Sequence, residues 1–211
     1  MIETITRFIF CFCLLVFIII FSTNFVEAGS FEIKNLPGPE IMPDSPFYFL
    51  KIWYEKIITF FNFNDLNKAE RYSELAERRL YEAERMAKKG KTDLVEKLIE
   101  SYNKFINKAI QKIEKVRQQG QKEANQGLTK ELGKISRSVL QNQESLLDLY
   151  KVVPEDVKNA IEKSFKITKI GYDKLIESLS GFQKEELIKK AEEIKNKAQQ
   201  IFKDWREIFG P

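Results

Sequence analysis

The chain of 211 residues contains no histidine and only two cysteines, and its formal net charge is +4. Its length suggests one domain, or at most two small ones, and is enough to bury a hydrophobic core. Without histidine it lacks the commonest general acid/base and the commonest metal ligand. Its 9 glycines and 6 prolines, against 31% charged and 43% hydrophobic residues, disfavour both a turn-rich β fold and a disordered chain. The composition favours long amphipathic helices.

The first 28 residues have the pattern of a secretory signal. A basic residue precedes 14 consecutive apolar residues, 8–21, a run shorter than the ~20 residues of a membrane-spanning helix. Val26 and Ala28 place small side chains three residues and one residue before a cleavage at Gly29. The alternative is an uncleaved anchor that extends to Phe25. Both interpretations place the remainder outside the cytoplasm of a bacterium, either secreted or tethered to the membrane.

Cleavage would leave a mature chain without thiol or imidazole groups, because Cys11 and Cys13 both lie in the signal. Residues 1–28 contain one basic and two acidic residues, so the mature chain would keep 34 basic and 29 acidic residues, a net charge of +5. Zinc, copper and haem sites of the usual kinds then lack their ligands. We therefore predict no cofactor, no metal site and no stabilising disulfide.

Only one segment has the spelling of a catalytic motif. Ser101 and Lys104 form S-x-x-K, the pattern of serine acyl enzymes, but the companion S-D-N and K-T-G elements are missing. Ser101 also falls within an expected helix, between apolar positions. There is no phosphate-binding glycine loop and no nucleophile elbow in the sequence. We therefore predict no catalytic residue and a protein that is not an enzyme.

A proline-rich tether, residues 29–43, is expected to lead into the helical part, since four of the six prolines lie within ten residues. Asp44 predicts a helix start as the capping residue, with Pro46 at the first helical position. The following segment, 47–61, is apolar on nearly every face. Such a helix is usually buried on several sides. The alternative is an aromatic-rich helix that lies in a membrane interface.

Apolar residues at spacings of three and four predict four longer helices between residues 64 and 179. Gly90 is expected to end the first, a polar loop at 118–127 to separate the second from the third, and Pro154 to open the fourth. Short connections make successive helices antiparallel. The predicted fold is all-α, an elongated antiparallel bundle of about five to six helices, some of them coiled-coil-like, with one helical domain at 44–179.

The last segment, 180–211, is expected to form an amphipathic helix whose apolar residues alternate in spacings of four and three over 183–208. This stripe spans three heptads, so a homo-oligomer formed through 183–208 is one expectation. Asn142 interrupts the apolar stripe of the third long helix. A polar residue at such a position often fixes register or oligomeric state; a small-ligand site is the alternative.

The positive charge is concentrated in one helix. Between residues 101 and 122 there are six basic residues and one acidic residue, a local charge of +5. Four lysines at helical spacing are expected to form one basic ridge: Lys104, Lys108, Lys112 and Lys115. The ridge is either an ordinary solvated face or a surface for anionic lipid head groups or an anionic envelope polymer. Nucleic acid is not an expected partner of an exported chain without a recognition motif.

Three segments carry a resemblance to a known family: LPGPEIMPDSPFYFLKIWYEKIITFFNFN (36–64), KAERYSELAERRLYEAERMAKKGK (68–91) and VPEDVKNAIEKSFKITKIGYDKL (153–175). They resemble an uncharacterised family of exported bacterial helical domains over most of residues 36–179, and PDSPFYFLK is the specific part. The resemblance implies an exported, all-helical domain of unknown function and transfers no catalytic or binding role. Within this motif we expect Asp44 to cap the first helix and four apolar residues to plug it into the bundle: Phe47, Phe49, Leu50 and Trp53.

Together these features predict a non-enzymatic helical scaffold or interaction module outside the cytoplasm. Its expected partner is an unknown protein or an envelope component. The alternative is a protein that binds an anionic membrane or envelope surface through the basic ridge, helped by the aromatic helix at 47–61.

Overall fold

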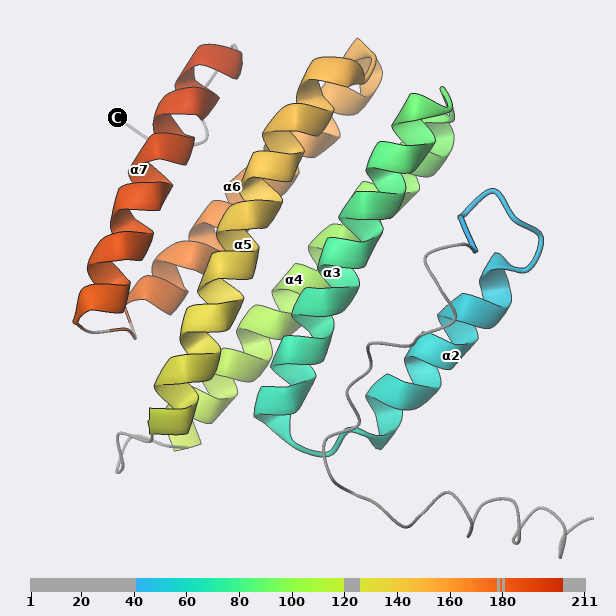
Figure 1. Ribbon diagram of the computed structural model, residues 1–211. Coiled ribbons are helices and arrows are strands. Elements are labelled where there is room, and N and C mark those ends of the chain that lie inside the picture. Colours follow the sequence, from blue (N-terminus) through green and yellow to red (C-terminus); the bar gives the residue numbers. More distant parts are fainter. Residues whose placement is uncertain (1–40, 120–125, 178, 180, 203–211) are drawn as a thin grey trace, which may run out of the picture. The chain divides into compact units, whose positions relative to one another are not determined.

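The computed structural model of the protein describes residues 41–119, 126–177, 179 and 181–202. Every element of regular structure in these ranges is an α-helix (Figure 1), which confirms the predicted all-α bundle. The helices are α2 (Tyr48–Phe61), α3 (Asp65–Lys88), α4 (Thr92–Gln119), α5 (Gln126–Val152), α6 (Glu155–Ile176) and α7 (Phe182–Ile201). The predicted signal at 1–28 and residues 29–40 of the predicted tether lie outside the described residues.

Four of the helices form a closed ring. α3 packs against α4, α4 against α6, α6 against α5, and α5 against α3. The hairpin partners α3 and α4 are antiparallel, as are α5 and α6. The pairs α3/α5 and α4/α6 are parallel, as shown by contacts whose residue numbers increase along both helices. These contacts are Glu70–Lys134 and Ser73–Ser138 for α3/α5, and Tyr102–Thr168 and Glu114–Lys174 for α4/α6.

The turn between α3 and α4 is built around Gly90, as the sequence predicts. Gly90 has a φ of 68°, in the left-handed region that glycine adopts without strain. Its backbone N–H bonds the carbonyl of Ala87 (2.9 Å), and the N–H of Lys91 bonds that of Met86 (3.0 Å). This pair of bonds is a Schellman motif, which satisfies the last carbonyls of α3 and reverses the chain.

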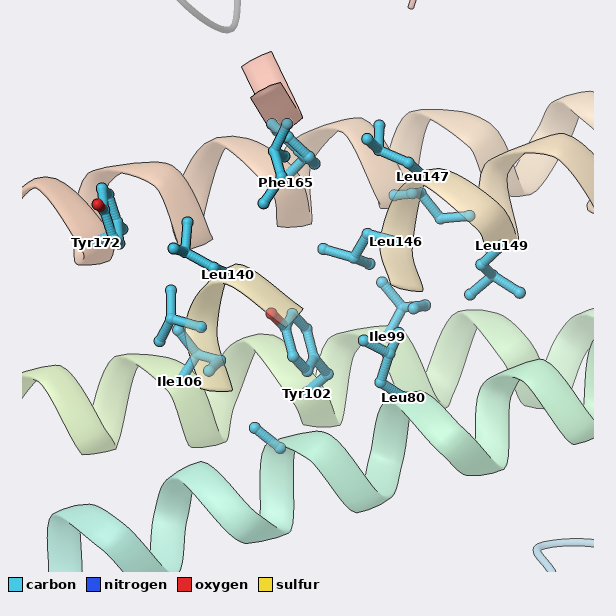
Figure 2. Packing of buried hydrophobic residues seen from close by; sticks show 14 of the residues in the cluster. Leu80, Ile99, Tyr102, Ile106, Leu140, Leu146, Leu147, Leu149, Phe165 and Tyr172 are labelled. Carbon is cyan, nitrogen blue, oxygen red and sulfur yellow. The ribbon is translucent and has the colours of Figure 1, made fainter. Parts of the chain in front are cut away.

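The ring encloses one hydrophobic core. Figure 2 shows side chains from all four helices meeting there. Leu80 of α3, Ile99 and Tyr102 of α4, Leu140 of α5 and Phe165 of α6 are all at most 2% exposed. Fully burying a side chain of this size contributes roughly 1.5–3 kcal/mol. The predicted apolar stripes therefore face this core.

Asn142 of α5 lies in the same core and is buried. The Tyr102 hydroxyl is hydrogen-bonded to the Thr168 hydroxyl (2.9 Å). The Asn142 side chain also interacts with the Tyr102 hydroxyl. Burial raises the pKa of Tyr102 above its ordinary value. The polar residue in the predicted stripe thus belongs to a small internal polar group between α4, α5 and α6.

One close approach fixes the distance between α4 and α6. A Cβ placed on Gly171 of α6 would overlap Cδ1 of Ile110 on α4. Gly171 is itself buried and helical, in a position that any residue could adopt by backbone conformation alone. Its small size, and not its conformational freedom, is therefore what this position requires.

α7 lies against α5 and α6. Its apolar side chains Leu187, Ile194 and Ala198 are buried there, and the ring of Phe202 packs edge-on against its neighbours on α5 and α6. The apolar stripe is therefore used within the chain over its described part, while residues 203–208 lie outside the described residues. The homo-oligomer expected through 183–208 stays a prediction, which a mass measurement over a range of protein concentrations tests.

Candidate functional site

α2 turns its polar side towards the bundle and its apolar side outward. Tyr48, Lys51, Glu55 and Thr59 recur at a spacing of three to four residues, and the first three make polar contacts with α3. The opposite face and its flanks carry exposed large apolar side chains: Phe47, Phe49, Leu50, Trp53, Tyr54, Ile57, Phe60, Phe61 and Phe63. We call these nine residues the aromatic face. Helices on a globular core normally show the reverse arrangement.

The prediction that Phe47, Phe49, Leu50 and Trp53 plug α2 into the bundle was wrong. These side chains are between 50% and 67% exposed. The reason lies on α3, whose side towards α2 carries charged residues that pair with the polar side of α2. The ring of four helices already encloses the core, so the aromatic side chains of α2 cannot pack into it.

The predicted capping role of Asp44 was also wrong. α2 begins at Tyr48, after Phe47 at the cap position, with no side-chain cap, and Pro46 lies in the preceding turn. Asp44 instead accepts hydrogen bonds from the ammonium groups of Lys89 and Lys91, both at 2.9 Å. These two hydrogen bonds lower the pKa of Asp44 to about 2. Asp44 therefore ties the segment before α2 to the turn between α3 and α4.

A buried ionic cluster joins α2 to α3. The Arg79 guanidinium lies between the carboxylates of Glu55 and Glu82 and donates to both. Glu82 also accepts from the Tyr48 hydroxyl and from the Lys51 ammonium, each at 2.6 Å. Glu55, Arg79 and Glu82 are only 2%, 1% and 0% exposed. Burial raises the pKa of Glu55, an effect that Arg79 opposes.

The cluster sets the orientation of α2. Burying a charge costs several kcal/mol unless a partner compensates it, and removing one partner of a buried pair costs about 3–5 kcal/mol. A rotation of α2 that brought the aromatic face inward would separate Glu55 from Arg79 and carry Glu55 away from every cation that now holds it. The apolar side of α2 is thus held outward by charges on its other side.

A groove of about 480 Å³ lies between α2, α3 and α4. Its apolar lining consists of Ile52, Phe60, Tyr72, Leu75 and Phe105. The rings of Tyr72 and Phe105 are stacked, with their centroids 6.2 Å apart. The rest of the lining is Glu55, Thr59, Ser101 and five cations: Lys56, Lys68, Arg79, Lys104 and Lys108. An aromatic wall and a group of cations therefore face the same space.

The predicted basic ridge divides into two halves. Lys112 and Lys115 both pair with Asp65, the first residue of α3, at 2.6 and 2.7 Å. Lys104 and Lys108 line the groove, and neither pairs with a carboxylate in the part of the chain that the structure describes. The Lys108 ammonium lies over the Tyr72 ring, 5.3 Å from its centroid. Burial, and after it the charge of Lys104, lowers the pKa of Lys108.

Ser101 and Lys104, the two residues of the S-x-x-K spelling, both line this groove. No hydrogen bond joins them within the described ranges, and α4 carries both in mid-helix. Among the residues of known placement, no three His, Cys, Asp or Glu side chains gather as metal ligands would. In the same ranges, none of the helices is both long and apolar enough to cross a bilayer.

The ionic cluster and the α2 and α3 walls of the groove do not follow from the patterns in the sequence. One signal for the cluster was present, since Tyr48, Lys51, Glu55 and Thr59 share one face of a helix whose other residues, apart from Lys56, are apolar or aromatic. Their partners on α3 lie more than twenty residues away along the chain. No local pattern links the two segments.

Part of the chain matches a known protein family. No curated protein and no solved structure shows significant similarity to the chain. Residues 40–156 match the family described as a domain of unknown function (DUF5667), over more than half of the chain. The match begins before α2, ends at the start of α6, and so includes every residue of the groove and of the ionic cluster. The chain therefore belongs to the DUF5667 family of domains of unknown function.

Proposed function

We propose that this domain is a non-enzymatic binding module that works outside the cytoplasm and attaches to an anionic membrane surface through α2. The observation that carries the proposal is the aromatic face, held outward by the buried ionic cluster. Helices that bind in the plane of a membrane interface place Trp, Phe and Leu at the acyl boundary and basic residues near the head groups. Trp and Tyr in particular are enriched at this depth.

The length of α2 sets how it would bind. At 1.5 Å per residue, its 14 residues measure about 21 Å, less than the ~30 Å of a bilayer's hydrocarbon core. α2 is therefore suited to lie in the interface and not to cross it. The groove that the four lysines line borders the aromatic face, because Phe60 belongs to both. Their charge is complementary to anionic lipid.

Vesicle binding tests the proposal. A chain of residues 29–211 serves best, because the apolar run at 8–21 would bind lipid by itself. Residues 41–211 form a compact unit that contains the whole described core. We expect this chain to sediment with vesicles that contain phosphatidylglycerol and less with pure phosphatidylcholine. Trp53→Ser combined with Phe60→Ser should weaken binding at least tenfold, since ~1.4 kcal/mol of lost apolar burial is already tenfold.

The matched control is Val152→Ser, which removes an exposed apolar side chain outside α2. It should leave binding unchanged. Equal vesicle binding by the α2 double variant and the parent chain would reject the proposal. The other candidate, docking to a protein outside the cytoplasm through the same face, would then be favoured if the parent chain bound no vesicles at all.

A further inference from the structure

We propose that the groove between α2, α3 and α4 is a binding site for one anionic phospholipid. Its head-group phosphate would be held by the groove lysines, and the first part of its acyl chains would lie against the aromatic wall. This inference rests on the proposed function and names the lipid feature that the domain recognises.

The positive charge of the groove favours the binding of an anion. Lys56 of α2, Lys68 of α3, and Lys104 and Lys108 of α4 approach from three different helices. Within the described residues none of the four pairs with a carboxylate. The single carboxylate of the lining, Glu55, is already held by Arg79 and Arg78. Four like charges therefore face one space, and a phosphate would relieve their repulsion.

The apolar lining favours a ligand that has an apolar part as well as a phosphate. Ile52 and the stacked pair Tyr72 and Phe105 are only partly buried, and they form a wall that a small inorganic anion would leave uncovered. The volume of about 480 Å³ lies within the range of small-molecule sites, roughly 300–1,000 Å³. A ligand that joins an anionic head to an apolar chain covers both parts of the lining.

The position of the groove agrees with this ligand. Phe60 lines the groove and also belongs to the aromatic face. A lipid in the groove would therefore lie next to the surface that meets the bilayer. Its head group would reach Lys104 and Lys108 while its chains continue along α2.

Monomeric short-chain lipids test the groove separately from membrane binding. We would titrate residues 29–211 with dihexanoyl phosphatidylglycerol below its critical micelle concentration and follow backbone amide shifts by NMR. The comparison ligands are dihexanoyl phosphatidylcholine, which has the same chains without net charge, and inorganic phosphate, which has no chain. We expect saturable binding of one phosphatidylglycerol, at least tenfold tighter than either comparison ligand, with the largest shifts on α2, α3 and α4 around the groove.

The divided ridge supplies a matched pair of variants. Lys104→Gln with Lys108→Gln removes two groove charges and should weaken phosphatidylglycerol binding at least tenfold. Lys112→Gln with Lys115→Gln removes two charges of the same helix that lie outside the groove and pair with Asp65, and should leave binding within twofold. Thermal unfolding curves would verify that both double variants are folded.

The outcomes separate this inference from the proposed function. Vesicle binding without monomer binding would overturn the groove site and leave the role of the aromatic face standing. Monomer binding without vesicle binding would support the groove site and reject membrane attachment. Phosphate binding as tight as lipid binding, or an equal loss in both lysine variants, would overturn the phospholipid site.

Discussion

At the scale of single residues, Arg79 decides how the first helix is attached. Its guanidinium is almost fully buried between Glu55 and Glu82, each from a different helix. A pair of carboxylates at this depth is tolerable only while a cation lies between them. Arg79 is therefore both the link between α2 and α3 and the residue that keeps the aromatic face outward.

Replacing Arg79 by alanine should lower the free energy of unfolding by about 3–5 kcal/mol, because it leaves two buried carboxylates with less compensation. Urea denaturation at pH 7 measures the loss. The control is Arg85→Ala on the exposed side of the same helix, which should change stability by no more than about 0.5 kcal/mol. Equal effects of the two variants would mean that the cluster does not hold α2.

Two aspartates make the fold sensitive to acid. Hydrogen bonds from Lys112 and Lys115 lower the pKa of Asp65 to about 2, and those from Lys89 and Lys91 do the same for Asp44. A carboxylate whose pKa is lowered on folding stabilises the folded state above its unfolded pKa, near 3.8. That stabilisation is lost as the pH falls from about 4 to about 2.

Asp65→Asn should therefore make the protein less stable at pH 6 and reduce the further loss between pH 4 and pH 2. Urea denaturation at pH 6, 4 and 2.5 measures both effects. Glu55 acts in the opposite direction, since its raised pKa lets stability fall as the pH rises above about 4.5. If Asp65→Asn followed the parent curve at every pH, the pairing of Asp65 with the two lysines would have no energetic role.

At the scale of elements, the sequence predicted the helices and the core-facing sides of α3 to α6, but not the orientation of α2. Gly90 and Pro154 mark turns that depend on local backbone chemistry, and both are placed correctly. The spacing of apolar residues predicts which side of each of the four core helices is buried, because each helix has a single apolar stripe and the bundle has a single core. The orientation of α2 could not follow in this way, since its apolar residues cover most of its circumference and its polar partners come from a distant segment.

The groove was predictable in part. The spacing of Lys104 and Lys108 placed both on one side of α4, and the structure agrees. The separation of these two from Lys112 and Lys115 depends on Asp65, which only the packing of α3 against α4 brings near. The lining from α2 and α3 depends on the same packing, which no spacing within one helix records.

The contact between α4 and α6 gives a prediction about packing. Gly171→Ala should destabilise the protein, because the added methyl group overlaps Ile110 and overpacking typically costs about 1–3 kcal/mol. In an Ile110→Val background, which lacks the overlapping Cδ1 atom, the same change should cost at least about 1 kcal/mol less. Urea denaturation of the four chains measures this coupling. Additive effects would contradict the close approach of the two helices.

At the scale of the whole molecule, the described residues separate into parts with different tasks. The ring of α3, α4, α5 and α6 holds the core, and α7 covers α5 and α6. α2 contributes little to that core and carries most of the exposed large apolar side chains. A rigid bundle that displays one apolar helix is the arrangement expected of a binding module, and membrane attachment is the use that we propose for it.

The depth of Trp53 in a bilayer tests this proposal most directly. The sequence has two tryptophans, so Trp205→Phe leaves Trp53 as the only one. Its fluorescence would be followed in residues 29–211 on adding phosphatidylglycerol vesicles whose lipids carry bromine atoms at defined positions along the acyl chains. We predict a blue shift and strongest quenching by the bromines nearest the head groups. Unchanged Trp53 emission while the protein is bound to the vesicles would contradict the account.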